Sequence, residues 1–259
     1  MQEQLHIALI QTDLIWEEPK ANRENIQARI DSISDTVDVI VLPEMFTTGF
    51  TMNATKHAET LSGASVTWMS QLAAAKQAAI MGSLIISEGG KYYNQLVFAY
   101  PNGDLKTYKK RHTFTLAGED KIYTAGTERS IIDYKGWSLC PLVCYDLRFP
   151  VWARYNNDYD VLFYVANWPK PRINAWDALL QARAIENMCY CVGVNRVGTD
   201  AKGHEYSGHS AVYNTLGETV SEFVENEVGF RIVVLTKEHI INTRQKFKFL
   251  NDRDAFSLE

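Results

Sequence analysis

Apolar runs of strand length alternate with segments of helical spacing through the first half of the chain. The run HIALIQTDL predicts a strand, whereas Ile26, Ile30 and Ile33 recur at the spacing of one helix face. The elements predicted in this half are strands over 6–14, 37–43, 79–87 and 93–100 and helices over 19–33 and 65–77. Gly89-Gly90 joins the last two strands, and Asn102–Asp104 has the composition of a hairpin turn.

The second half of the chain repeats this plan. The elements predicted there are strands over 137–144, 159–167 and 189–198, strands within 209–223 around a turn at Leu216-Gly217, and helices over 151–155 and 175–187. The strands that begin near Asp38 and Asp160 match most clearly, because each is an apolar run that ends in a polar residue. Such a repeat in an α/β chain predicts two related sheets packed together, with helices on the outer faces. No linker or low-complexity tract interrupts the chain, so we expect a single domain over residues 1–259.

Composition narrows the class of protein. The chain of 259 residues is 46% hydrophobic and 22% charged, with a formal net charge of -5. It lacks the basic footprint of a nucleic-acid-binding protein. We expect no membrane span and no signal peptide, because no apolar run is long enough and the N-terminus has no basic region before an apolar one. Four cysteines without an export signal predict reduced thiols and a cytoplasmic location.

Three side chains capable of chemistry fall where predicted strands end, namely Glu44, Cys144 and Asn167. Sites in alternating α/β folds lie at the C-terminal edges of the strands. Cys140, Cys189 and Cys191 fit the ordinary interpretation of a buried strand cysteine, and Cys144 differs because its strand stops there and YDLRFP begins. A turn from strand into helix would expose the sulfur and direct backbone N–H groups at whatever it attacks. Spacing alone leaves both packing and catalysis open for Cys144.

Glu44 and the lysine pair that follows a predicted strand each have a structural and a catalytic interpretation. Glu44 is either a helix cap or a base at the mouth of a site, where burial would raise its pKa toward the range useful for proton transfer. Lys109 and Lys110 are either a pair of solvated lysines or a strand pair with one side chain pointing inward, where it would act electrostatically on a thiolate or an oxyanion. Each residue taken alone favours the structural interpretation.

Other catalytic patterns are missing from the sequence. The segment His204–His209 has one residue too many for a zinc-protease helix and contains a glycine, so we expect a loop before a strand there. There is no G-x-S-x-G elbow and no phosphate-binding glycine loop. The cysteines lack C-x-x-C spacing, which makes a structural zinc site unfavourable.

Glu44, Lys110 and Cys144 together make the chain resemble the nitrilase superfamily of carbon–nitrogen hydrolases. That family has a Glu–Lys–Cys triad in this order. The segments that carry the resemblance are Pro43-Glu44, the Y-x-K-x-H-x-F pattern of Tyr108 to Phe114, CYDLRFP at Cys144–Pro150, ANWP at Ala166–Pro169, QARAIEN at Gln181–Asn187 and GVNRVG at Gly193–Gly198. The lysine pattern selects Lys110 over Lys109, and Glu119 fits a second family glutamate. The resemblance covers nearly the whole chain.

The resemblance implies a four-layer αββα sandwich of two packed mixed sheets and a homodimer or larger homo-oligomer. Within the superfamily the chain is most similar to bacterial omega-amidases, which hydrolyse the terminal amide of small 2-oxo acid amides such as 2-oxoglutaramate and 2-oxosuccinamate. The implied roles are Cys144 as nucleophile, Glu44 as general base, and Lys110 with the Tyr145 backbone N–H as oxyanion donors. Glu119 would orient Lys110 or the substrate amide. No metal and no organic cofactor is implied.

The remaining expectations concern the substrate pocket. Arg172 is the candidate cation for a substrate carboxylate, with a surface arginine as the alternative. Phe46 and Trp168 are candidate pocket walls, and Asn167 a candidate substrate contact. We expect Arg148 to form a structural salt bridge, to Asp146 or another acid.

Alternative functions remain open at this point. Three use the same triad: a nitrilase, an N-carbamoyl amino-acid hydrolase and a deaminated-glutathione amidase. A non-catalytic binding protein on the same fold is another. A thiol redox protein is disfavoured, because Cys140 lies too far from Cys144 along an extended strand for an easy disulfide.

Overall fold

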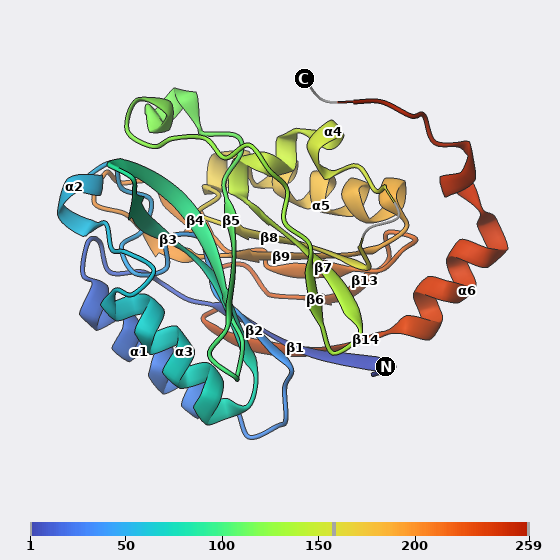
Figure 1. The fold of residues 1–259 in the computed structure, drawn as a ribbon, viewed down its shortest axis with the longest axis horizontal. Helices are drawn as coiled ribbons and strands as arrows, with labels where there is room; N and C mark the ends of the chain where they lie inside the picture. Colours follow the sequence, from blue (N-terminus) through green and yellow to red (C-terminus); the bar gives the residue numbers. More distant parts are fainter. Residues whose placement is uncertain (1, 157–158, 258–259) are drawn as a thin grey trace.

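The strands form two six-stranded sheets in the computed structural model, which describes residues 2–156 and 159–257 (Figure 1). The first sheet has the strand order β14 (Gly229–Thr236), β1 (Gln4–Gln11), β2 (Val39–Val41), β3 (Ala79–Glu88), β4 (Lys91–Ala99) and β5 (Leu105–Lys109). The second has the order β13 (Thr219–Glu222), β12 (Ala211–Tyr213), β9 (Tyr190–Asn195), β8 (Val161–Ala166), β7 (Trp137–Val143) and β6 (Ile132–Tyr134).

The two sheets share one plan, which confirms the predicted repeat. Strands β1, β2 and β3 are parallel, and the other three strands of that sheet pair antiparallel. Strands β7, β8 and β9 are likewise parallel, with antiparallel β6, β12 and β13. Asp38 and Asp160 precede the middle parallel strands and accept equivalent backbone N–H groups, from His6 at 2.8 Å and Ser138 at 2.9 Å.

Helices cover the outer face of each sheet and complete the four layers. Helices α1 (Pro19–Asp31) and α3 (Ala64–Lys76) lie along the first sheet, and α5 (Ile173–Asn187) covers the second (Figure 1). Side chains alternate along β1 accordingly. Leu5, Ile7 and Leu9 pack in one core cluster with the second sheet, while Ala8 and Ile10 pack with α1 and α3. The expectation of two packed sheets with outer helices is confirmed.

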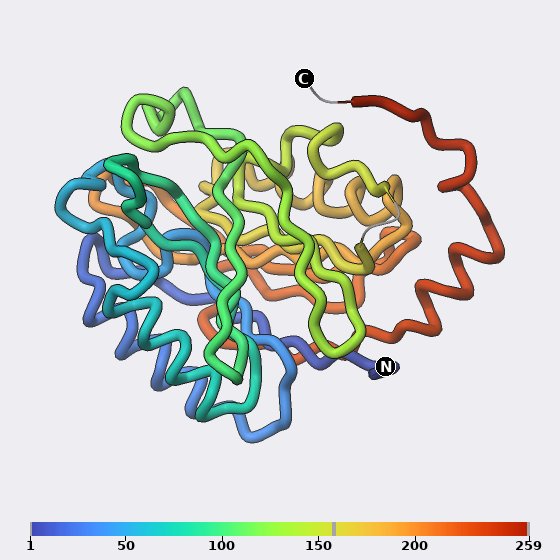
Figure 2. The backbone as a smooth tube through the Cα atoms, in the orientation of Figure 1, coloured from blue at the N-terminus to red at the C-terminus, as the bar shows by residue number. Residues whose placement is uncertain are grey.

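Several segments differ from the predictions. The strand predicted over 189–198 breaks at the buried Arg196, because β9 belongs to the second sheet and β10 (Val197–Thr199) pairs with β11 (Glu205–Ser207) in a separate ribbon. Strand β11 lies where a loop was expected. Two elements near the C-terminus, β14 and α6 (Lys237–Phe247), were not predicted, and Figure 2 shows α6 beside the two sheets rather than over either of them.

The described residues contain no helix that is both long enough and apolar enough to cross a membrane. Short elements fill several of the connections. They are α2 (Ala54–His57), α4 (Pro150–Ala153) and the 3-10 turns Thr115–Ala117, Glu119–Lys121, Cys144–Arg148, Lys170–Arg172 and Phe249–Asp252.

Candidate active site

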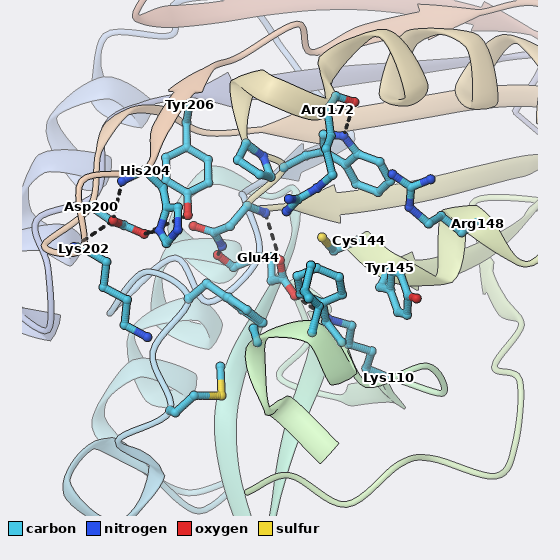
Figure 3. Close-up of a pocket in the computed structure, with 18 residues that line it drawn as sticks. Glu44, Lys110, Cys144, Tyr145, Arg148, Arg172, Asp200, Lys202, His204 and Tyr206 are labelled. Atoms are coloured by element: carbon cyan, nitrogen blue, oxygen red, sulfur yellow. Dashed lines mark hydrogen bonds and ion pairs between the residues drawn. The ribbon is translucent and has the colours of Figure 1, made fainter. Parts of the chain in front are cut away.

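Cys144 lies at the point where β7 turns into a 3-10 helix. Its φ of +44° is left-handed, a conformation that a residue with a side chain seldom adopts and that is often found at functional sites. The turn presents Cys144 to a pocket of about 370 Å³ (Figure 3). Tyr145 is the second residue of the 3-10 helix Cys144–Arg148, so its backbone N–H has no acceptor within that helix. A sulfur and a free backbone donor are therefore adjacent.

A buried carboxylate holds this turn in place. The two oxygens of Asp146 accept hydrogen bonds from the Val143 backbone N–H at 3.0 Å and the Tyr108 hydroxyl at 2.8 Å, and from the backbone N–H and Nδ1 of His112 at 3.0 and 2.7 Å. Asp146 thus joins the nucleophile turn to the segment that follows β5. That segment contains Lys110, so the lysine and the cysteine are positioned together.

Glu44, Lys110 and Glu119 form a buried charge cluster beside the cysteine. The Lys110 Nζ lies 3.0 Å from Glu44 Oε1 and 2.9 Å from Glu119 Oε2, and no side chain of the three is more than 1% exposed. Glu44 follows β2, Lys110 follows β5 and Cys144 follows β7, and Figure 3 shows the three side chains converging. The structure therefore brings the predicted triad and Glu119 into one site.

Asn94 joins both carboxylates and was not singled out from the sequence. Its Nδ2 donates to Glu44 Oε1 at 2.7 Å and to Glu119 Oε1 at 3.1 Å. Its Oδ1 accepts from the Ser83 hydroxyl, whose oxygen accepts the Met45 backbone N–H. This chain directs the Asn94 amide nitrogen toward the carboxylates. A polar residue within the apolar strand YNQLVFAY is the signal that could have revealed it.

The protonation states of the cluster depend on burial and on the neighbouring charges. Burial lowers the pKa of Lys110, but the Glu119 and Glu44 carboxylates outweigh it, so the net shift is upward and the ammonium persists. Burial raises the pKa of Glu119, assisted by Glu44 and opposed by Lys110. The pKa of the Cys144 thiol is raised well above its ordinary value by burial and by Glu44, which outweigh Lys110. Cys144 therefore rests as a thiol facing a carboxylate.

Two arginines stand at the other side of the cysteine. The Arg148 guanidinium lies over the Trp168 ring at 4.8 Å, and that of Arg172 lies over the Phe114 ring at 5.2 Å. All four residues line the pocket. Within residues 2–156 and 159–257, neither guanidinium has a carboxylate partner, so the salt bridge expected for Arg148 is wrong. The Asp146 carboxylate already accepts four other donors.

Phe46 does not line the pocket, which corrects the expectation from the sequence. It is fully buried in the cluster between the first sheet and α3, with its ring 5.8 Å from that of Trp68. Met45 adopts a left-handed φ of +42°, and the chain after Glu44 then turns Phe46 toward the outer face of the sheet. Phe50 and Met52 are the pocket walls from this segment.

The loop that carries Phe50 and Met52 is anchored by Glu17. The Glu17 carboxylate accepts the Thr51 hydroxyl at 2.6 Å, lies 3.0 Å from His57 Nε2 and contacts the Asn53 amide at 3.4 Å. Burial raises the pKa of Glu17, but the hydrogen bonds of Thr51, His57 and Asn53 outweigh it and lower the pKa to about 2.

The ribbon of β10 and β11 forms the far rim of the pocket and was not predicted as part of the site. It contributes Asp200, Lys202, His204 and Tyr206 (Figure 3). The Asp200 carboxylate accepts the Tyr206 hydroxyl at 3.0 Å and contacts His204 Nδ1 at 3.1 Å. Over the part of the chain that the structure describes, no group of three or more His, Cys, Asp or Glu side chains is placed to hold a metal ion.

Asn167 and Trp168 follow β8 and line the pocket, as expected. The Asn167 backbone N–H donates to Glu44 Oε2 at 2.8 Å, and its Nδ2 donates to the Glu44 backbone carbonyl at 2.6 Å. Asn167 therefore holds Glu44 at two points. Trp168 donates its indole N–H to the Arg172 carbonyl at 2.8 Å, which supports the segment that carries the arginine.

Known proteins share both the sequence and the architecture. A family model described as carbon–nitrogen hydrolase matches residues 6–245. "Omega-amidase YafV" of Escherichia coli (strain K12) is 42% identical over 98% of each chain. "2-oxoglutaramate amidase" of Bacillus subtilis is 33% identical over 83% of this chain and 85% of its own. A solved CN-hydrolase superfamily protein of Xanthomonas campestris, with an arsenic adduct in its active site, superposes with a TM-score of 0.96 at 37% identity and full coverage of both chains.

Proposed function

We propose that this chain, which belongs to the carbon–nitrogen hydrolase family, is an omega-amidase that hydrolyses the terminal amide of small 2-oxo acid amides to the dicarboxylate and ammonia. The observation that carries the proposal is the site itself: a thiol beside a buried Glu44–Lys110–Glu119 cluster, in a pocket that also contains two arginines without carboxylate partners among the described residues. The full-length similarity to omega-amidases supports the choice of substrate.

Acylation uses the thiol and the carboxylate as a pair. Glu44 takes the proton of Cys144 as the sulfur attacks the amide carbon. The developing oxyanion is stabilised by the Lys110 ammonium and the Tyr145 backbone N–H. The C–N bond then breaks, the nitrogen takes the proton from Glu44 and leaves as ammonia, and a thioester remains on Cys144. Glu119 positions Lys110 through two contacts of 2.9 and 3.1 Å to its Nζ.

Deacylation repeats the same steps with water. Glu44 takes a proton from the attacking water, the same donors hold the second oxyanion, and the proton returns to the sulfur as the acid leaves. One carboxylate thus serves both half-reactions, and its hydrogen bonds to Asn94, Asn167 and Lys110 keep it in place throughout.

The substrate carboxylate is bound by Arg172, with Arg148 beside it. Arginine suits a carboxylate because its planar fork can donate two parallel hydrogen bonds. Cation–π contacts with Trp168 and Phe114 hold both guanidinium groups at the pocket wall. Trp168 therefore contributes by supporting Arg148 as well as by closing the pocket.

Ammonia release tests the function. The panel is 2-oxoglutaramate, 2-oxosuccinamate, glutamine, an aliphatic nitrile and an N-carbamoyl amino acid. We expect fast turnover of the two 2-oxo acid amides and its loss in Cys144→Ala, while Cys140→Ala, a change at a buried cysteine of β7, the strand that precedes Cys144, remains active. Turnover of another compound alone would replace the substrate, and activity of Cys144→Ala would overturn the mechanism.

We also propose a homodimer or larger homo-oligomer in the cytoplasm. All four cysteines are free thiols, which suits a reducing compartment. Light scattering of the purified protein tests the assembly, and a monomer would refute it.

A further inference from the structure

The Phe114 ring lies between the cation for the substrate carboxylate and the turn that carries the nucleophile. The Arg172 guanidinium lies over this ring at 5.2 Å, and the Tyr145 ring lies 4.9 Å from it on another side. Both distances suit favourable contacts, a cation–π contact with Arg172 and an aromatic pair with Tyr145. Phe114 is half-buried and lines the pocket, so its ring belongs to the wall beside which a substrate binds.

The backbone of Phe114 is joined to the buried charge cluster. Its N–H donates to Glu119 Oε2 at 2.5 Å, and the same oxygen lies 2.9 Å from Lys110 Nζ. The Phe114 carbonyl accepts the Glu119 backbone N–H at 3.2 Å. A hydrogen bond to a carboxylate is stronger than a neutral one, so it holds this backbone firmly. The residue that contacts Arg172 is therefore anchored beside the lysine that stabilises the oxyanion.

Arg172 depends on this ring because no acid holds it. Among the side chains that the structure describes, none with a carboxylate pairs with its guanidinium, which lies over Phe114 instead. An arginine side chain has several rotatable bonds, and ordering a free one when a substrate binds costs conformational entropy. A substrate of fixed length also needs a fixed separation between this cation and the oxyanion donors.

We propose that Phe114 is a positioning residue, which holds the Arg172 guanidinium at a fixed place relative to the oxyanion donors and so selects amides that carry a carboxylate. This inference rests on the proposed amidase function. The aromatic face contacts the cation, and the backbone ties that face to Glu119 and Lys110. An aliphatic side chain fills similar space but offers the guanidinium no π-face, so it loses the hold on Arg172 and keeps the backbone contacts.

The test compares two amides that differ only at the far end. They are 2-oxoglutaramate and 4-oxopentanamide, in which a methyl group replaces the carboxylate. We expect the ratio of their kcat/KM values to fall about three- to tenfold in Phe114→Leu, the size of one cation–π contact. Phe114→Met, a second change to an aliphatic side chain, should give the same fall. Phe114→Tyr keeps the aromatic face and should keep the wild-type ratio.

Phe149→Leu is the matched control. The Phe149 ring also contacts the Tyr145 ring, at 5.0 Å, and it stacks on His112 at 3.8 Å. It contacts no arginine among the described residues and does not line the pocket. A general disturbance of the nucleophile turn should lower turnover of both amides alike. We therefore expect this variant to leave the ratio unchanged.

A double-mutant cycle with Arg172→Leu needs only the charged substrate. If Phe114 acts through Arg172, Phe114→Leu should change kcat/KM for 2-oxoglutaramate by less than about twofold once the arginine is gone. An unchanged ratio in folded Phe114→Leu, an equal fall in Phe114→Tyr, or the same factor with and without Arg172 would overturn the inference. Wild-type ammonia release from 2-oxoglutaramate would still leave the amidase function standing, and its absence would overturn both.

Discussion

Asp146→Asn is the change for which the structure gives the sharpest expected cost. The carboxylate has two hydrogen bonds at each oxygen: Val143 N–H and Tyr108 at one, and the backbone N–H and Nδ1 of His112 at the other. Asparagine keeps the shape but replaces one oxygen with an NH₂ group. The His112 ring can change tautomer to accept from it, whereas the Tyr108 oxygen already accepts the Trp152 indole N–H at 2.9 Å and the Arg111 backbone N–H at 3.2 Å, so the NH₂ group is best placed toward His112. A backbone N–H cannot become an acceptor, so one is left facing a donor in either orientation.

The magnitude follows from that single orphaned donor. A buried backbone N–H without a partner costs about 1–3 kcal/mol, and hydrogen bonds to a charged acceptor are roughly twice as strong as neutral ones. We therefore expect Asp146→Asn to lower the free energy of unfolding by about 2–4 kcal/mol, which for a chain of this length is a fall in Tm of roughly 5–15 °C. Because Val143 directly precedes Cys144, kcat should also fall, by about tenfold or more.

Differential scanning calorimetry and ammonia release measure the two effects. Asp133→Asn is the control, since Asp133 is exposed and accepts one side-chain hydrogen bond, from Ser138 at 3.1 Å. It should match wild type in both assays. The reasoning would be refuted if Asp146→Asn kept the wild-type Tm within about 1 °C and the wild-type kcat, because the turn would then not depend on these hydrogen bonds.

Three further predictions follow from single sites. Gly208→Ala should lower the free energy of unfolding by about 2–3 kcal/mol, because φ is +82° and a Cβ would lie 2.4 Å from the Gln11 side-chain amide. The control Gly203→Ala, at φ +81° with nothing within 4 Å, should lower it by only about 1 kcal/mol. Equal losses of the two variants in urea denaturation would contradict this prediction. Glu17 has a pKa lowered to about 2, so its contribution is present above its ordinary pKa of 4.5 and is lost as the pH falls toward 2. The stability gap between wild type and Glu17→Gln should thus be about 1–2 kcal/mol at pH 7 and shrink below pH 4.5 in urea denaturation, and a gap that does not change with pH would refute it. Lys110→Met should lower kcat at least a hundredfold with the fold intact by circular dichroism, and a loss below tenfold would remove it from the oxyanion site.

The long helices with a regular apolar pattern were predictable from the sequence, and the strand at the C-terminal end of the first sheet was not predicted. The helices predicted over 19–33 and 175–187 match α1 and α5 within two residues at either end, because one apolar face recurs along each. Strand β14 was missed although its segment GFRIVVLT has the composition of a strand. Whether a strand joins a sheet edge depends on long-range pairing, here with β1.

In the site, too, some residues could be placed from the sequence and others could not. The triad could be recognised because its residues occur in family segments that follow predicted strands. Phe46 could not be placed, since its direction depends on the left-handed turn at Met45. Arg148 was expected to pair with Asp146 or another acid because of its place in the sequence, but the Asp146 carboxylate already accepts hydrogen bonds from Val143, Tyr108 and His112.

The charges of the resting site explain why one lysine lies between two glutamates. A buried ammonium with one carboxylate would be a neutral pair. A second carboxylate, Glu119, shares that ammonium and leaves the cluster with one excess negative charge when both carboxylates are ionised. Burial and the Glu44 carboxylate raise the pKa of Cys144, and Lys110 opposes them only in part. Proton transfer therefore becomes favourable only when a substrate carbonyl is present to receive the negative charge as an oxyanion at Lys110. The arrangement keeps the thiol protonated in the empty pocket and couples its activation to the bound amide.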